Sequence, residues 1–100
     1  MPARMAINME QIEAFCRKWK VKEFSLFGSV LRDDFRPDSD VDALVDLLPD
    51  NGLDLFDWVD MIEELKEIFG RDVDLVDKAA IENPYRRHII LKSREVVYAA

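Results

Sequence analysis

Apolar residues recur along this chain with two spacings, one typical of helices and one typical of strands. The first group follows the positions i, i+3, i+4 and i+7 of a helical face and comprises Ile12, Phe15, Cys16 and Trp19. Asn8 precedes this group as a capping residue, with Gln11 at the third helical position. We therefore predict a helix over residues 9–20.

A longer helical stripe lies in the middle of the chain. It comprises Leu55, Val59, Ile62, Leu65 and Phe69, widened by Phe56, Trp58 and Ile68. Gly70 stands where a helix commonly ends, so we predict a helix over residues 53–69. Asn83 and Pro84, a cap followed by a proline at the first helical position, predict a third helix over residues 85–92.

Three further segments favour strands, at residues 21–27, 41–47 and 72–76, and a short closing strand can follow at 96–98. In the second strand, one face comprises Val41, Ala43, Val45 and Leu47, and the other comprises Asp40, Asp42, Leu44 and Asp46. Between the first two strands we expect a short helical turn at 30–32 and a loop at 33–39. The order of these elements predicts an α/β (α+β) fold, a small mixed sheet with helices packed on it.

Length, net charge and cysteine content limit the number of domains, the kinds of partner and the cellular compartment that we expect. A chain of 100 residues has room for one core, so we expect a single domain, which we place at residues 8–100. We expect residues 1–7 to be a loose leader. The net charge of −7 weighs against direct nucleic-acid binding and suits divalent cations or a basic partner. Cys16 is the single cysteine, so no intrachain disulfide forms. With no apolar run of membrane-spanning length, we expect a cytoplasmic protein that does not associate with a membrane.

Candidate chemistry begins with carboxylates. Asp40 and Asp42 stand two residues apart on a predicted strand, so their side chains point the same way, about 7 Å apart. Such a pair suits one or two Mg²⁺ ions, which take carboxylate oxygens and substrate phosphates as ligands. The strand at 72–76 offers a third carboxylate. Asp72 and Asp74 share a face, and we favour Asp74 because it lies inside the strand between apolar residues.

A possible phosphate-binding turn stands between the first two strands. Gly28 allows close backbone approach, and the free N–H groups at a helix start attract anions. The Ser29 hydroxyl can donate to a terminal phosphate, and Arg32, one turn later, can offset phosphate charge. With the carboxylates, these residues predict a nucleotidyl transfer driven by positioning and charge neutralisation.

The same residues resemble a known signature. Gly28-Ser29, ten residues, and then Asp40-Val41-Asp42 is similar to the Gly-Ser, ten residues, Asp-x-Asp pattern of the DNA polymerase β-like nucleotidyltransferase superfamily. The Arg-Pro-Asp-Ser-Asp run at 36–40, the short chain, and the segments at 73–76, 83–85 and 96–98 resemble its minimal nucleotidyltransferase (MNT) branch. The resemblance implies the polymerase β-like fold for nearly the whole chain after residue 8.

The resemblance also implies a reaction and a partner. MNT domains are typically encoded beside an all-helical HEPN ribonuclease toxin and act as its antitoxin. The implied reaction is Mg²⁺-dependent transfer of AMP from ATP to a tyrosine of the HEPN protein, with Asp40, Asp42 and Asp74 as the catalytic and metal-binding residues. Because this chain has no room for a further domain, we expect the partner to present the acceptor.

Two other functions are compatible with the same core. The chain can neutralise a toxin by binding alone, with its carboxylates as remnants, or it can modify a small molecule such as an aminoglycoside. Three further features have more than one reading or no assigned role in the reaction. His88 is interpreted as structural. The acidic residues of the predicted helix at 53–69 form either a solvated face or a surface for a basic partner, and Arg86 and Arg87 either belong to a solvated face or contact the nucleotide or the partner.

Overall fold

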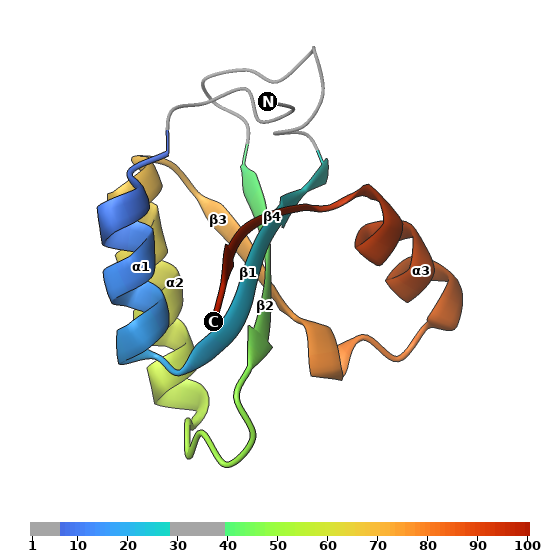
Figure 1. Ribbon diagram of the computed structural model, residues 1–100, viewed down its shortest axis with the longest axis horizontal. Coiled ribbons are helices and arrows are strands. Elements are labelled where there is room, and N and C mark those ends of the chain that lie inside the picture. The colour runs from blue at the N-terminus through green and yellow to red at the C-terminus, as the bar shows by residue number, and fades with distance from the viewer. Residues whose placement is uncertain (1–6, 29–39) are drawn as a thin grey trace.

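The computed structural model describes residues 7–28 and 40–100 of the chain. In this part, helices lie on both faces of a four-stranded sheet (Figure 1). The elements are α1 (Met9–Lys18), β1 (Val21–Phe27), β2 (Val41–Leu47), α2 (Leu55–Phe69), β3 (Val73–Asp77), the short 3₁₀ helix η2 (Lys78–Ala80), α3 (Pro84–Ser93) and β4 (Glu95–Ala99).

The strand order across the sheet is β3-β2-β1-β4. β1 pairs antiparallel with both β2 and β4, whereas β2 and β3 run parallel. The parallel pair needs a crossover, which α2 supplies. The predicted mixed sheet with packed helices is therefore confirmed.

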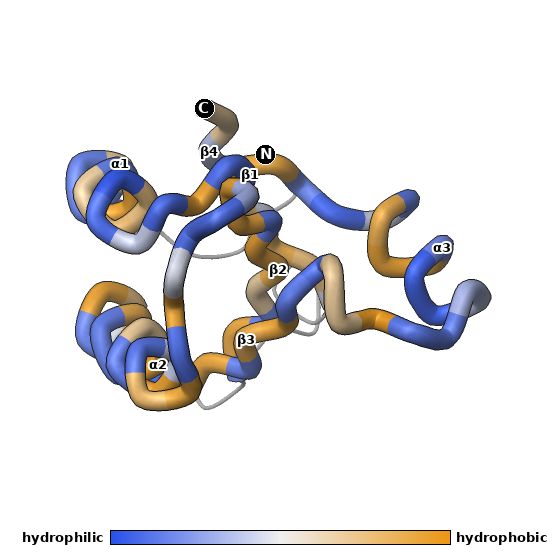
Figure 2. The backbone as a smooth tube through the Cα atoms, turned by 90° about the horizontal axis from the view of Figure 1, so that it is seen from below, coloured by the Kyte–Doolittle hydropathy of each residue, from blue (hydrophilic) through white to orange (hydrophobic). Residues whose placement is uncertain are grey.

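The larger core lies between the sheet and the two helices α1 and α2, which cover the same face (Figures 1 and 2). Its buried members are Ile12, Phe15, Cys16, Trp19, Val21, Phe24, Leu26, Val41, Ala43, Val45, Met61, Leu65, Phe69 and Leu75. Glu64 of α2 joins the helices at their outer edge, because its carboxylate accepts from Lys18 Nζ at 2.8 Å and Trp19 Nε1 at 3.0 Å.

A smaller core lies on the other face, beside α3 (Figure 2). Phe27, Leu44, Ile81 and Ile90 are buried there. The two faces predicted for β2 are confirmed, since Val41, Ala43 and Val45 belong to the larger core and Leu44 to the smaller one. Strand alternation therefore directs Asp42 to the face on which α3 packs.

The predicted helix caps are confirmed. Asn8 Oδ1 accepts from the backbone N of Gln11 at 3.1 Å, and Asn83 Oδ1 accepts from two backbone N–H groups at the start of α3. Gly70 ends α2 in the left-handed conformation at φ 70°. The first helix ends at Lys18 rather than at the predicted Lys20, because Lys20 has φ 58° and turns the chain into β1.

The predicted apolar stripe of α2 is wrong over its first turns. Leu55, Phe56 and Val59 are 74%, 80% and 50% exposed. The face that packs on the sheet instead comprises Met61, Leu65 and Phe69, with Trp58, Ile62 and Ile68 partly buried beside them. At about 100° of rotation per residue, Val59 lies roughly 120° around the helix from Leu65, and Phe56 lies on the opposite side. The first turns therefore carry a separate apolar surface.

Some predictions fall on parts of the chain outside the described residues. These are the leader up to residue 6, the helical turn at 30–32 and the loop at 33–39, so the boundary between leader and domain stays a prediction. Ile7 packs against the larger core. Among the described helices, none is both long and apolar enough to cross a membrane.

Candidate functional site

The register of the parallel strands brings two of the predicted carboxylates together. Asp42 of β2 lies directly opposite Asp74 of β3. Neighbouring strands are about 4.8 Å apart, and paired residues of parallel strands point to the same face, so the two carboxylates are side by side. Asp40 comes two residues before Asp42, immediately before β2 begins. Asp40 and Asp74 are exposed and Asp42 is half-buried, so solvent reaches this group.

Gly28 lies against this group. It follows Phe27, which pairs with Asp42 across the antiparallel strands β1 and β2, and it has φ 72°. A Cβ atom at this position would lie 3.1 Å from Asp42 Cγ and closer still to Oδ2. Glycine is therefore required both by the left-handed backbone and by the approach of the carboxylate.

The other predicted members of the site have different positions. Ser29 and Arg32 lie outside the described residues, so their phosphate contacts stay predictions. Asp72 comes just before β3 and forms an exposed ion pair with Lys66, whose Nζ is 3.7 Å from Asp72 Oδ1. The parallel register thus places Asp74, and not Asp72, opposite Asp42.

The chemistry of these side chains suits Mg²⁺. In residues 7–28 and 40–100, no three acidic, histidine or cysteine side chains form a ready-made metal cage. Mg²⁺ does not need such a cage, because it is commonly bound by one or two carboxylates together with waters and substrate phosphates. Asp40, Asp42 and Asp74 carry hard oxygen atoms of the kind that Mg²⁺ takes as ligands, and the absence of a side chain at Gly28 leaves space for the carboxylate of Asp42.

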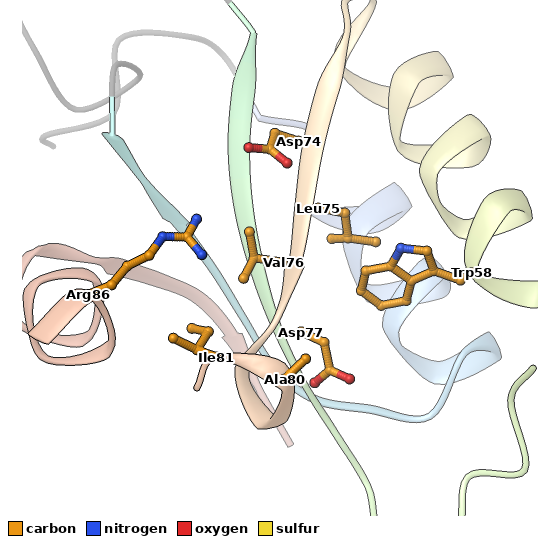
Figure 3. A pocket seen from close by; sticks show the side chains of 8 residues that line it. All are labelled: Trp58, Asp74, Leu75, Val76, Asp77, Ala80, Ile81 and Arg86. Atoms are coloured by element: carbon orange, nitrogen blue, oxygen red, sulfur yellow. The ribbon is translucent and has the colours of Figure 1, made fainter. Parts of the chain in front are cut away.

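Two cavities border the site, one along the edge strand β3 and one beside α3. The first, of about 480 Å³, extends past Asp74 and β3; Trp58, Asp74, Leu75, Val76, Asp77, Ala80, Ile81 and Arg86 line it (Figure 3). The second, of about 380 Å³, lies between Gly28 and α3; it is lined by Phe27, Gly28, Tyr85, Arg86, Ile89, Ile90 and Ser93. Arg86 borders both cavities.

The sequence pattern leaves the role of Arg86 open, and it includes Tyr85 only as part of the segment 83–85 that resembles the MNT branch. The available signal was the Asn83-Pro84 cap, which fixes the first turn of α3 and hence the direction of the two side chains that follow it. What the pattern could not show is that this turn packs beside Gly28, more than fifty residues earlier in the chain.

Other residues considered from the sequence lie away from the carboxylate group or have structural partners. Asp46, on the same face of β2, pairs with Lys78, whose Nζ is 3.5 Å from Asp46 Oδ2. His88 is exposed and lines a different cavity on α3. Cys16 is a fully buried core residue, and burial, followed by the charge of Glu13, raises the pKa of its thiol to about 12.

Comparison with known proteins finds both sequence and structural similarity. Residues 9–97 match the family model described as a nucleotidyltransferase domain. Protein adenylyltransferase MntA of Thermococcus cleftensis is 32% identical over 102 residues, covering 92% of this chain and 96% of that protein. A candidate protein adenylyltransferase of Methanocaldococcus jannaschii is 40% identical over 68 residues, covering 68% of each chain.

Similar solved structures share the fold. A minimal nucleotidyltransferase is 29% identical, with a TM-score of 0.67 over 87% of this chain and 86% of that one. A toxin–antitoxin structure with AMP-PNP has a TM-score of 0.74 at 22% identity, over 94% of this chain and 75% of that one. A complex of tri-AMPylated HEPN toxin from Shewanella oneidensis with an MNT antitoxin has a TM-score of 0.67 at 21% identity, over 92% and 70%.

Proposed function

The chain belongs to the nucleotidyltransferase domain family, and from that premise we propose that it is a protein adenylyltransferase that transfers AMP from ATP to a tyrosine of a HEPN toxin and thereby acts as its antitoxin. The observation that carries this proposal is the pairing of Asp42 with Asp74 beside Gly28. The relative named protein adenylyltransferase MntA, which is matched over nearly its whole length, supports a protein as the acceptor. The similar complex with an AMPylated HEPN toxin supports the identity of that protein.

The proposed reaction is a displacement at the α-phosphorus of ATP. The tyrosine oxygen forms a bond to this phosphorus, the bond from the phosphorus to the oxygen that bridges to the β-phosphate breaks, and pyrophosphate leaves. The hydroxyl proton passes to the carboxylate of Asp74, which lies beside Asp42 and is open to solvent. We propose that Gly28 lets the phosphates approach the backbone, while Ser29 and Arg32 hold the β- and γ-phosphates.

We propose that Asp40, Asp42 and Asp74 would hold Mg²⁺, and that two ions would bind when ATP is present. Bound Mg²⁺ would neutralise phosphate charge and polarise the reacting phosphoryl group. The chain's own contribution is a fixed acidic group on neighbouring strands, so that little reorganisation is needed when the nucleotide binds. Removing the metal with a chelator is therefore expected to stop the transfer, and added Mg²⁺ to restore it.

The acceptor and the place of reaction are part of the same proposal. The net charge of −7 favours a protein acceptor over a nucleic acid, because a polyanion would be repelled on average. The single cysteine is buried and forms no disulfide, which is compatible with a reducing compartment, and we propose the cytoplasm as the site of action.

Intact-mass measurement of the HEPN partner tests this function. After incubation with this protein, ATP and Mg²⁺, we expect the mass of the partner to rise by one or more AMP units. Asp42→Asn should slow the transfer by roughly 100-fold or more, because a ligand and a fixed charge are lost. Asp46→Asn is the matched control, since it removes a carboxylate from the same strand and face and should leave transfer unchanged.

Two results would contradict the proposal. An unchanged partner mass with wild-type protein would exclude adenylyl transfer to that partner. Full protection from the toxin by Asp42→Asn, without any gain in mass, would instead show that the antitoxin acts by binding alone.

A further inference from the structure

The first turn of α3 is held rigidly against the rest of the domain. Asn83 Oδ1 accepts from the backbone N of Tyr85 at 2.9 Å and of Arg86 at 3.1 Å. The guanidinium of Arg87 donates from Nη1 to the Lys78 carbonyl oxygen at 2.7 Å, which ties α3 to η2. Tyr85 and Arg86 therefore project from a fixed backbone, as a preformed binding surface requires.

Arg86 lies at the junction of the two cavities. It lines the cavity that contains Asp74 and also the cavity that contains Gly28. Figure 3 shows its side chain extending from α3 towards the strands, on the same side of β3 as Asp74 and Val76. Within residues 7–28 and 40–100, its guanidinium has no hydrogen bond or ion pair. A guanidinium without a partner among the described residues, in the same cavity as the carboxylate of Asp74, suits an anion that lies between the two side chains.

The cavity between Gly28 and α3 has a different character. Its walls are largely apolar, from Phe27, Ile89 and Ile90, and Tyr85 adds an aromatic ring that is 76% exposed. A volume of about 380 Å³ falls within the usual range for small-ligand sites. An exposed aromatic ring beside aliphatic side chains suits the flat face of a nucleobase, because stacking needs no particular hydrogen-bond pattern.

We propose that this cavity is the nucleoside subsite, that the ring of Tyr85 packs on the base, and that Arg86 contacts the triphosphate where it passes from Gly28 towards Asp74. The inference rests on the proposed function and extends it to two residues outside the Gly28-to-Asp42 motif. The physical reason for Arg86 is charge. Asp40, Asp42 and Asp74 repel a polyanionic substrate, and a fixed guanidinium offsets part of that repulsion.

Competition binding with the full chain and Mg²⁺ tests the inference, using ATP and inorganic tripolyphosphate as competitors of a fluorescent ATP analogue. Arg86→Gln should raise the Kd of both competitors roughly tenfold, as expected for loss of one charge-assisted contact. Arg86→Lys should recover part of this loss, because it keeps the charge but not the planar fork. Lys92→Gln is the matched control: it removes the same charge from α3 but faces a different cavity, so ATP should bind as in wild type.

The same assay separates the base from the phosphates. Tyr85→Ala should raise the Kd of ATP about tenfold and leave tripolyphosphate unchanged, whereas Tyr85→Phe should bind both as in wild type because it keeps the ring. Thermal unfolding of each variant establishes that the fold is intact; Tyr85 and Arg86 are both exposed, so all variants should unfold near the wild-type temperature.

The outcomes distinguish this inference from the function on which it rests. Wild-type protein that binds no ATP would overturn the proposed function and the inference together. ATP binding that Arg86→Gln leaves unchanged, or that Lys92→Gln weakens equally, would overturn the role of Arg86 while leaving the function intact. Equal loss of ATP and tripolyphosphate binding in Tyr85→Ala would overturn the nucleoside subsite.

Discussion

Among single residues, Gly28 is the one whose replacement has the most direct consequence at the site. Its backbone is left-handed, and the space that a side chain would fill is occupied by the carboxylate of Asp42. Gly52 has nearly the same φ, at 70°, but nothing lies within 4 Å of where its Cβ would be. The two glycines therefore separate backbone strain from steric contact with the site.

This pair gives a prediction about Gly28→Ala and Gly52→Ala. Gly52→Ala should lower the free energy of unfolding by about 1 kcal/mol, because alanine disfavours the left-handed region, and Gly28→Ala should lower it by at least as much, because its methyl group also contacts Asp42. Only Gly28→Ala should also reduce AMP transfer, by more than roughly tenfold, since the new methyl group displaces Asp42. Urea unfolding measures the first effect and the intact-mass assay measures the second. Equal activity of the two variants would show that the contact with Asp42 has no functional role.

Among the elements, α2 presents two apolar surfaces with different environments. Met61, Leu65 and Phe69 pack on the sheet, whereas Leu55, Phe56 and Val59 lie in solvent, separated by the rotation of the helix. Acidic residues flank the exposed surface, with Asp54 capping the helix through a hydrogen bond of 2.8 Å from the backbone N of Asp57. Among the described residues, the inner surface belongs to the larger core and the outer one does not.

The two surfaces should respond differently to alanine. Leu65→Ala should lower the free energy of unfolding by about 2–5 kcal/mol, because it leaves a cavity in the larger core. Val59→Ala removes a half-exposed side chain and should change it by less than about 0.5 kcal/mol. Denaturant titration followed by circular dichroism measures both. A large effect of Val59→Ala would mean that the first turns of α2 also pack against the domain.

The elements that could be predicted from sequence are those defined by local signals. The strands at 21–27 and 41–47 have the predicted bounds, because the alternation of apolar and polar residues and the adjacent turn residues can be identified from neighbouring positions in the sequence. The caps at Asn8, Gly70 and Asn83 are equally local. The buried face of α2 was not predictable in this way, since its first turns are apolar on more than one side and only tertiary packing selects the face.

The residues of the candidate site also differ in whether local sequence alone can identify them. The presence of Asp40, Asp42 and Gly28 in one motif is local, and it could be recognised from spacing. The choice between Asp72 and Asp74 depends on the register of β3 against β2, which a single strand does not contain. The neighbourhood of Arg86 depends on how α3 packs beside β1, a contact between residues far apart in sequence.

In the whole molecule, α1, α2 and the sheet enclose a continuous core with Cys16 inside it. The thiol is fully buried, and its pKa is raised to about 12 by burial and then by Glu13. A thiol in the unfolded chain ionises near the ordinary value of 9.0. Burial of the neutral thiol therefore stabilises the fold fully below that pH, and this contribution is lost as the pH rises towards 12.

The sign of this linkage leads to a prediction for alkaline solutions. Between pH 9 and 11, the free energy of unfolding of the wild type should fall more steeply than that of Cys16→Ala, which has no thiol to ionise. Because lysines and tyrosines titrate equally in both proteins, the difference between their slopes isolates Cys16. Parallel slopes would show that the thiol does not change its pKa on folding.

The burial of Cys16 has a practical consequence for fluorescent labelling of this domain. Because the chain's one sulfhydryl is shielded from solvent, a reagent such as a maleimide dye should ignore it at neutral pH for as long as the domain stays folded. In a Val59→Cys variant, the introduced cysteine on the exposed side of α2 would then be labelled selectively, and Cys16 could be kept. Fluorescence from that position could report when a second macromolecule arrives.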